Sequence, residues 1–323
     1  QDGNAITFTN IASDSHQPFY GAFIKNINLC HNTTDAANKD GYALERWCGT
    51  QHVDYFTSAR PAAGIKLSLN GVEWDETAML SLPFYMSHTN GALAPFGNVK
   101  RLRLPSTLGS TYEITAREYA NHSYLKEVEI PSSVTKINSS AFAGSGVEKV
   151  SILGNPTIAD DAFSDITLKD LTLQNASVAG TKFSNSYYLE HLTLYTGTLA
   201  DQAFEHCSNL ETISVSPEVK IVDGTHPFDD CFHVNNIDAL SYWASSAMDI
   251  FAKPVWVQLI DIWNYETDFR KNLLINGVEP KVLTFDMETV PEYSLSRIKN
   301  IKNIVLTDKV KSIGRHAIHS VGL

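Results

Sequence analysis

A phenylalanine recurs every 20 to 24 residues through the middle of this 323-residue chain, and no other feature restricts the fold as much. Ahead of each phenylalanine stands an apolar triplet with the spacing Leu-x-x-Leu-x-Leu. The phenylalanines are Phe142, Phe163, Phe183, Phe204 and Phe228, and the triplets are Leu125/Val128/Ile130, Val147/Val150/Ile152, Leu168/Leu171/Leu173, Leu189/Leu192/Leu194 and Leu210/Ile213/Val215. Self-similarity at a fixed period indicates a repeat architecture.

Two flanking copies extend the array. The upstream copy has Val99/Leu102/Leu104 with Ile114 and Tyr119, and the downstream copy has Ile301/Ile304/Leu306 with Ile313 and Ile318. Gly322 and Leu323 end the sequence, and Leu323 follows Ile318 at the same distance at which Val147, the first residue of a triplet, follows Phe142. We therefore expect the array to continue or to have been cut there.

The triplet predicts a short strand in each repeat. Its last two apolar residues fall on one face, because the side chains of a strand alternate. Burial of about half a dozen apolar side chains does not offset the entropy lost by ordering a repeat of this length. A single repeat therefore cannot fold alone, whereas stacked repeats share a core and pair their strands into a parallel sheet.

Composition excludes several classes of function. Lys and Arg number 25 against 36 Asp and Glu, a net charge of −11, which disfavours nucleic acid and anionic membranes as partners. No run of 18 apolar residues is present, so we expect no transmembrane segment. The chain opens QDGNAITFTN, so we expect no signal peptide within it.

A longer duplication interrupts the array twice. ALERWCGT at 43–50 parallels ALSYWASS at 239–246, and each is followed by a proline and then by SLNGVE (68–73) or LINGVE (274–279). Asn-Gly between apolar runs predicts a tight hairpin, because a type I′ turn needs two positive φ angles. Each duplicated segment is therefore expected to be a helical insert plus a hairpin, leading into a strand at Leu80/Leu82 or Leu283/Phe285.

The second insert has the clearer helical pattern. Ile237, Leu240, Trp243, Ala247 and Phe251 recur at i+3 or i+4 and predict one helix, with Asn235 or Asn236 as its cap. Pro254 is expected to open a second helix that places Val257, Ile260 and Trp263 on one face. The tryptophans and tyrosines of the insert are Tyr242, Trp243, Trp256, Trp263 and Tyr265. Their spacing along a stripe favours packing on the array over a sugar-binding platform.

The repeats resemble the BspA-like leucine-rich repeats of bacterial surface proteins. LKEVEIPSSVTKINSSAF (125–142) and AFEHCSNLETISV (203–215) match that pattern, and IVLTDKVKSIGRHAI (304–318) is the same unit with Ile318 in place of phenylalanine. The resemblance implies a mainly β leucine-rich repeat solenoid with a parallel sheet, which the duplicated segments interrupt with short helical inserts and Asn-Gly hairpins. It further implies a secreted or cell-surface bacterial protein that is not an enzyme and acts in adhesion by binding a host or neighbouring-cell protein.

Five regions follow from the pattern. They are an N-terminal cap or decayed repeat (1–39), a helical insert plus hairpin (40–79), BspA-like repeats (80–233), a second insert plus hairpin (234–280) and further repeats (281–323).

The sequence offers only weak candidates for catalytic or metal-binding residues. Cys48 near His52 reads as a core cysteine, the loop at 35–41 lacks the carboxylates of a calcium site, and His316 with His319 has no apparent third metal ligand. We therefore expect no catalytic residue, no metal and no cofactor. Cys207 and Cys231 occupy one slot of adjacent repeats and are expected to be buried, reduced thiols, because parallel Cβ vectors disfavour a disulfide. The sequence does not decide whether Cys30 and Cys48 form a disulfide.

The remaining candidate is the solvent face of the strands. One column of outward residues reads Arg101, Glu127, Lys149, Asp170, His191 and Thr212, and the next reads Arg103, Glu129, Ser151, Thr172, Thr193 and Ser214. We predict that binding uses Arg101, Arg103, Glu127, Glu129, Lys149, Ser151, Asp170, Thr172, His191 and Thr193. An open polar surface suits a macromolecule better than a small substrate. The alternative is a glycan-binding or glycan-processing module that uses the aromatic inserts.

Overall fold

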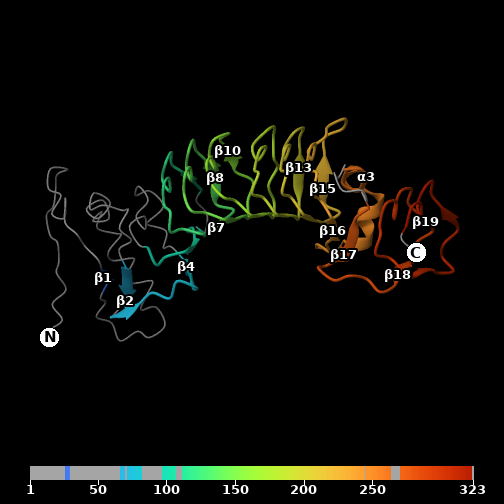
Figure 1. Ribbon diagram of the computed structural model, residues 1–323, viewed down its shortest axis with the longest axis horizontal. Helices are drawn as coiled ribbons and strands as arrows, with labels where there is room; N and C mark the ends of the chain where they lie inside the picture. The colour runs from blue at the N-terminus through green and yellow to red at the C-terminus, as the bar shows by residue number, and fades with distance from the viewer. Residues whose placement is uncertain are drawn as a thin grey trace. The chain divides into compact units, whose positions relative to one another are not determined.

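The computed structural model of the protein describes residues 26–29, 66–69, 71–81, 97–106, 111–243, 245–262 and 270–321. The chain divides into two compact units (Figure 1). Unit 1 comprises residues 1–150 and 156–166, and unit 2 comprises residues 151–155 and 167–323. Both units are built from strands that pair with the next repeat, which confirms the predicted parallel β-solenoid.

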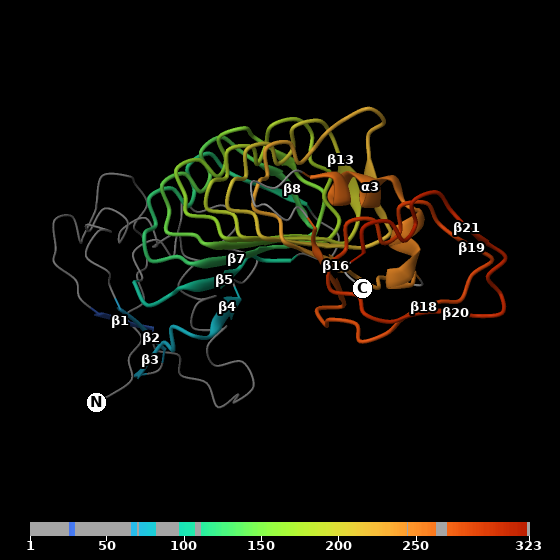
Figure 2. The same ribbon diagram turned by 45° about the vertical axis from the view of Figure 1, so that its right-hand side comes forward.

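In unit 1 the triplets form one parallel ladder and the residues after them form a second. β4, β5 and β7 pair in parallel, and β6, β8 and β10 make the other ladder, on the opposite side of the coil (Figure 2). The strands of unit 1 are β1 (Asn26–Leu29), β2 (Lys66–Leu69), β3 (Val72–Glu73), β4 (Met79–Ser81), β5 (Arg101–Arg103), β6 (Tyr112–Ile114), β7 (Glu127–Ile130), β8 (Val134–Ile137) and β10 (Thr157–Ile158). β9 (Lys149–Ile152) contains the boundary between the units.

Unit 2 repeats the scheme. β11, β12, β14, β16 and β17 follow one another in parallel register, β13 pairs with β15, and two further ladders join β18 to β20 and β19 to β21. Its elements are β11 (Asp170–Leu173), β12 (His191–Leu194), β13 (Gly197–Leu199), β14 (Thr212–Val215), β15 (Val219–Ile221), β16 (Asn236–Ala239), the 3-10 helix η3 (Ala247–Ala252), α3 (Pro254–Asp261), β17 (Asn272–Ile275), β18 (Leu283–Phe285), β19 (Thr289–Val290), β20 (Ile304–Leu306) and β21 (Ser312–Ile313).

The core is made from the predicted repeat positions. All three residues of each of the five central triplets are buried, with at most 5% of any side chain exposed. The upstream copy is equally buried, from Val99 to Tyr119. In the downstream copy Ile301 is buried, but Leu306 in β20 is 41% and Ile313 in β21 is 51% exposed.

The repeat aromatics stack within each unit. In unit 1 the ring of Phe142 lies between Tyr119 and Phe163, with both centroid distances 5.2 Å. In unit 2 Phe204 lies between Phe183 at 5.8 Å and Phe228 at 5.7 Å. All four interplanar angles are 10° or less. The 20- to 24-residue period therefore produces a continuous stack of rings along each core.

Two residues after the aromatic position, every described repeat turns through a left-handed backbone conformation. The residues at this position are Asn121, Gly144, Asp165, Asn185, His206, Asp230, Arg297 and Ser320, with φ between 54° and 64°. Glycine, asparagine, aspartate and histidine are the residues that most readily adopt this conformation. Close stacking also restricts Gly146, since a Cβ atom there would lie 2.1 Å from the carbonyl oxygen of Ser123.

Both Asn-Gly segments form the predicted hairpins. β2 and β3 pair antiparallel around Gly71, and Ile275 bridges Val278 around Asn276 and Gly277, whose φ angles are 50° and 78°. The duplication extends to a later asparagine that the sequence argument missed. Asn98 hydrogen-bonds both backbone groups of Leu67, at 2.8 and 3.0 Å, and Asn300 does the same for Leu273, at 2.9 and 3.0 Å.

The helix predicted from Ile237 to Phe251 is wrong. Residues 236–239 form β16, and Val234, Ile237 and Ala239 are buried in the strand spacing of another repeat triplet. Parallel hydrogen bonding to β14 and β17 outweighs the coincidental helical spacing. Trp243 is correspondingly not on a core stripe, and its side chain is 86% exposed. A short 3-10 helix, η3, begins only at Ala247, behind a capping box formed by Ser246 and Asp249.

Pro254 opens α3 as predicted. α3 packs beside β15 and buries Val255, Trp256, Leu259 and Ile260, while Val257 is half-buried (Figure 1). Trp263 and Tyr265 lie outside the described residues, as do the 35–41 loop, Cys30, Cys48 and His52.

Cys207 and Cys231 are free and fully buried, as predicted. Each thiol donates to the carbonyl oxygen of the preceding repeat's phenylalanine, with Sγ–O distances of 3.3 Å for Cys207 and Phe183 and 3.2 Å for Cys231 and Phe204. The neighbouring Cys207 and burial together raise the pKa of Cys231.

The ring stack predicts a steep dependence of stability on the aromatic position. Phe204→Ala should lower the free energy of unfolding by about 3–5 kcal/mol, because its ring is fully buried between two others. Thr193→Ala, on the solvent face of the neighbouring β12, should cost less than about 1 kcal/mol. Chemical denaturation of the two variants measures both values, and equal losses would contradict the repeat register.

Candidate functional site

The strand face of unit 1 is a set of ion pairs that join successive repeats. Arg101 Nε lies 2.6 Å from Glu127 Oε2, and Lys149 Nζ lies 3.8 Å from Glu127 Oε1. In the next column Arg103 Nε lies 2.6 Å from Glu129 Oε1. The parallel register that places Arg101 opposite Glu127, and Arg103 opposite Glu129, produces these contacts.

These side chains are paired with one another but accessible. The three cationic side chains are 39–48% exposed and the two glutamates 18–24%. Hydrogen bonds and Coulomb attraction from Glu127 and Glu129 raise the pKa of Arg101 and Arg103 respectively. The structure thus brings Arg101, Arg103, Glu127, Glu129 and Lys149 together in a single charged surface, which we call the unit-1 face.

The strand face of unit 2 has a different chemistry. Asp170, His191 and Thr212 are register partners, as are Thr172, Thr193 and Ser214. Beyond them the columns continue into Asn236 and Asn272, and into Asp238, which the sequence analysis had assigned to a helix. This surface, the unit-2 face, is a ladder of hydroxyl, amide and carboxylate groups. Ser151 falls in unit 2 and is half-buried.

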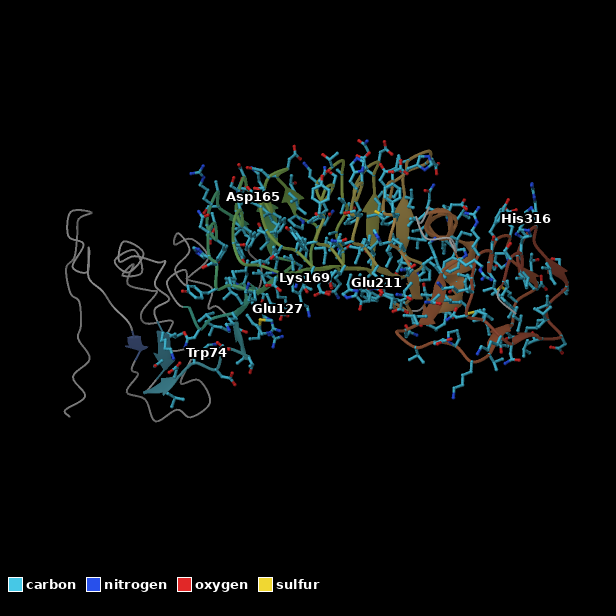
Figure 3. All side chains as sticks on the ribbon, viewed as in Figure 1. Trp74, Glu127, Asp165, Lys169, Glu211 and His316 are labelled. Atoms are coloured by element: carbon cyan, nitrogen blue, oxygen red, sulfur yellow. The ribbon has the colours of Figure 1, made fainter. Side chains whose placement is uncertain are left out.

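Hydrogen bonds along the unit-2 face join neighbouring strands. Asn272 Nδ2 donates to Asn236 Oδ1 at 3.0 Å, and Asn236 Nδ2 donates to Thr212 Oγ1 at 3.3 Å. Asp238 accepts from the backbone N–H of Gly277 at 2.9 Å and from Ser214 Oγ at 3.3 Å. Burial nevertheless raises the pKa of the Asp238 carboxyl. Figure 3 shows Lys169 and Glu211, which precede β11 and β14, along this strand side, and His316 on the turn side.

The structure separates the aromatic residues of the second insert. Trp256 is fully buried against Phe251, with ring centroids 4.8 Å apart, so it offers no surface to a ligand. Trp243 is exposed and meets Tyr242 edge-on at 5.7 Å, and Tyr242 lies 5.1 Å from Tyr195. These three rings form an aromatic cluster that only the fold assembles.

Two further candidates are a metal site at His316 and His319 and the buried Lys271. No group of three or more His, Cys, Asp or Glu side chains in the described residues is placed to hold a metal ion, and His316 and His319 are both exposed. Lys271 is an unusual titratable group, with 1% of its surface exposed and Nζ donating to the Ile262 carbonyl at 2.8 Å. Burial and the nearby Arg297 lower the pKa of Lys271 to about 8.

Stacked triplet strands, a left-handed turn in each repeat and an accessible polar strand face define a leucine-rich repeat solenoid. The sequence profile described as BspA type leucine-rich repeat region matches six copies, within residues 111–235 and 276–323, which is more than half of the chain. The protein therefore belongs to the BspA-type leucine-rich repeat family. Repeat proteins of this kind commonly serve as scaffolds for protein–protein interaction.

Two bacterial proteins of known structure are similar to the chain. A leucine-rich repeat protein from Bacteroides ovatus ATCC 8483 shares 16% identity with a TM-score of 0.24, over 79% of this chain and 70% of its own. A leucine-rich repeat protein from Eubacterium ventriosum ATCC 27560 shares 16% identity with a TM-score of 0.23, over 76% of this chain and 57% of its own. No curated protein matches the chain. None of the helices in the described residues has the length and apolar character needed to cross a bilayer.

The buried lysine predicts a pH dependence of stability. The unfolded chain holds the Lys271 proton up to a pKa near 10.5 and the folded chain only to about 8. Between these values the unfolded state binds more protons, so stability rises with pH. Relative to Lys271→Met, the free energy of unfolding of the unmodified protein should rise by up to about 3 kcal/mol from pH 8 to pH 10.5. A difference that stays constant across this range would contradict the prediction.

Proposed function

We propose that this protein is a non-enzymatic, secreted or cell-surface protein that binds another protein through its strand faces. The observation that carries the proposal is the unit-1 face, where two rows of alternating charge are held in register by the parallel strands. Such a surface is ordered before binding, so a partner does not have to organise these side chains itself. Membership of the repeat family supports the same class of function.

Charge complementarity is the physical basis of recognition on this face. Glu127 already has cations on two sides, so the face presents an alternating pattern rather than a single sign of charge. A partner with the opposite alternation aligns in one register and is repelled in the shifted one. The unit-2 face, with its hydroxyl and amide ladder, supports water-mediated and hydrogen-bonded contact with a protein surface.

The first experiment identifies the partner and the second locates the surface. A pull-down of extracellular host proteins with the whole chain supplies a purified partner, whose affinity is then measured for paired variants. Arg103→Glu combined with Glu129→Arg reverses the column while retaining the ion pair. The melting temperature should be unchanged and the affinity should fall at least tenfold, about 1.4 kcal/mol.

The single substitution Arg103→Glu is the matched comparison, because it places two like charges opposite each other. It should weaken both the fold and binding. The loss caused by the double reversal should shrink at high salt, because exposed charges are screened beyond about 10 Å at 0.1 M. Unchanged affinity for the double reversal would exclude the unit-1 face as the binding surface.

The aromatic cluster of Tyr195, Tyr242 and Trp243 supports one alternative, a glycan-binding function. Trp243 is 86% exposed and its φ of 51° is unfavourable for a bulky residue, so neither burial nor backbone preference explains a tryptophan there. The exposed indole of Trp243 meets the ring of Tyr242, which in turn contacts Tyr195, and an exposed indole offers an apolar plane that suits the face of a sugar.

A glycan array separates the two functions. Trp243→Ala should retain the melting temperature and abolish any glycan signal, since this ring is largely in solvent. Tyr187→Ala removes another exposed aromatic, 53% accessible and outside the cluster, and should leave the signal unchanged. An array without any glycan signal for the unmodified protein, together with protein capture, would reject the glycan alternative.

A further inference from the structure

A hollow of about 600 Å³ opens in unit 2, and none of the residues that line it belongs to the strand faces. Its lining includes Asp261 from the end of α3, Arg270, Tyr293, Arg297, His316 and His319. The volume falls in the range of small-molecule sites, which run from about 300 to 1,000 Å³. Nothing in the function proposed above uses this hollow.

Two arginines are among the described residues that line the hollow, in a chain whose net charge is −11. Arg270 and Arg297 carry permanent positive charge, and Asp261 is the acidic residue among the described lining residues. Arg297 Nη1 donates to Asp261 Oδ1 at 2.8 Å, which holds the guanidinium in place while 43% of the side chain stays exposed. The buried Lys271 interacts electrostatically with both Arg297 and Asp261.

Arg297 also breaks a regularity of the fold. It occupies the left-handed position two residues after the aromatic slot, with a φ of 60°. At the seven equivalent positions in the described repeats the residue is asparagine, aspartate, glycine, histidine or serine. A long side chain there is unfavourable by backbone conformation, and strained residues of this kind cluster at functional sites.

Aromatic rings form the wall beside the arginine. The ring of Tyr293 stacks on His316 with centroids 5.6 Å apart, and His316 meets His319 edge-on at 5.1 Å. Arginine binds a carboxylate through two parallel N–H···O bonds, and ring faces bind the apolar body of a small molecule. We propose that this hollow binds a small carboxylate-bearing molecule, with Arg297 on the carboxylate and Tyr293, His316 and His319 against the remainder.

The carboxylate has two chemical sources, a sugar acid or an acidic amino acid, and ligand-observed NMR titrations with the full chain distinguish them. Galacturonate and N-acetylglutamate are the probes, and galactose is the neutral control because it has a hydroxymethyl group where galacturonate has its carboxylate. At least one acid should bind ten times more tightly than galactose, and the tighter one identifies the source. If neither acid binds more tightly than galactose, the proposal is wrong.

Arg297→Asn tests the assignment within the protein. Asparagine tolerates the left-handed backbone, so the melting temperature should be retained or raised while affinity for the acid falls at least tenfold. Arg117→Asn is the matched control, because Arg117 is an exposed arginine with a φ of 62° in unit 1 and should leave binding unchanged. His316→Gln, at an exposed position, provides a second loss of affinity that is independent of Arg297. Unaltered affinity in both hollow variants would overturn the proposal.

Discussion

Each repeat of this protein is stable only because its neighbours complete it. A turn of about twenty residues presents a triplet strand whose hydrogen bonds and apolar faces both need a partner, so strand pairing and core formation occur together. Leu192 illustrates the arrangement, since it is fully buried and lies in register between Leu171 and Ile213. In β20 and β21, by contrast, the repeat residues Leu306 and Ile313 are exposed.

The turn that returns the chain to the next strand is as regular as the strand itself. Ring stacking sets one side of the turn, and the left-handed residue two positions later reverses the chain. Short polar residues satisfy that requirement at most repeats, because their side chains tolerate positive φ. The requirement is local, so the outward parts of each repeat remain free to vary, and the unit-1 face, the aromatic cluster and the hollow differ in chemistry on one kind of scaffold.

Because the scaffold is constant and its surface varies, we propose different kinds of ligand for different surfaces of the same protein. The strand faces are open and polar, and such surfaces suit an extended protein partner. The hollow and the aromatic cluster of unit 2 are smaller, combine rings with polar groups, and suit small or glycan ligands. The buried groups Trp256 and Cys231, although chemically notable in the sequence, serve packing.

The sequence by itself determined the repeat, the parallel strands, the buried triplets, both hairpins and the in-register columns of the strand faces, because each depends on spacing along the chain. It did not determine which of two spacings applies at Ile237, since a triplet and a helical stripe share that residue and only pairing with β14 and β17 decides between them. The ion pairs of Arg101 and Arg103 form only because the neighbouring strand lies in register and places a glutamate opposite each arginine. The sequence also did not determine that Trp243 is exposed, or that one hollow is lined by residues from different turns, namely Arg270, Tyr293, Arg297 and His316. The directions of these side chains follow from backbone conformations that no local pattern specifies.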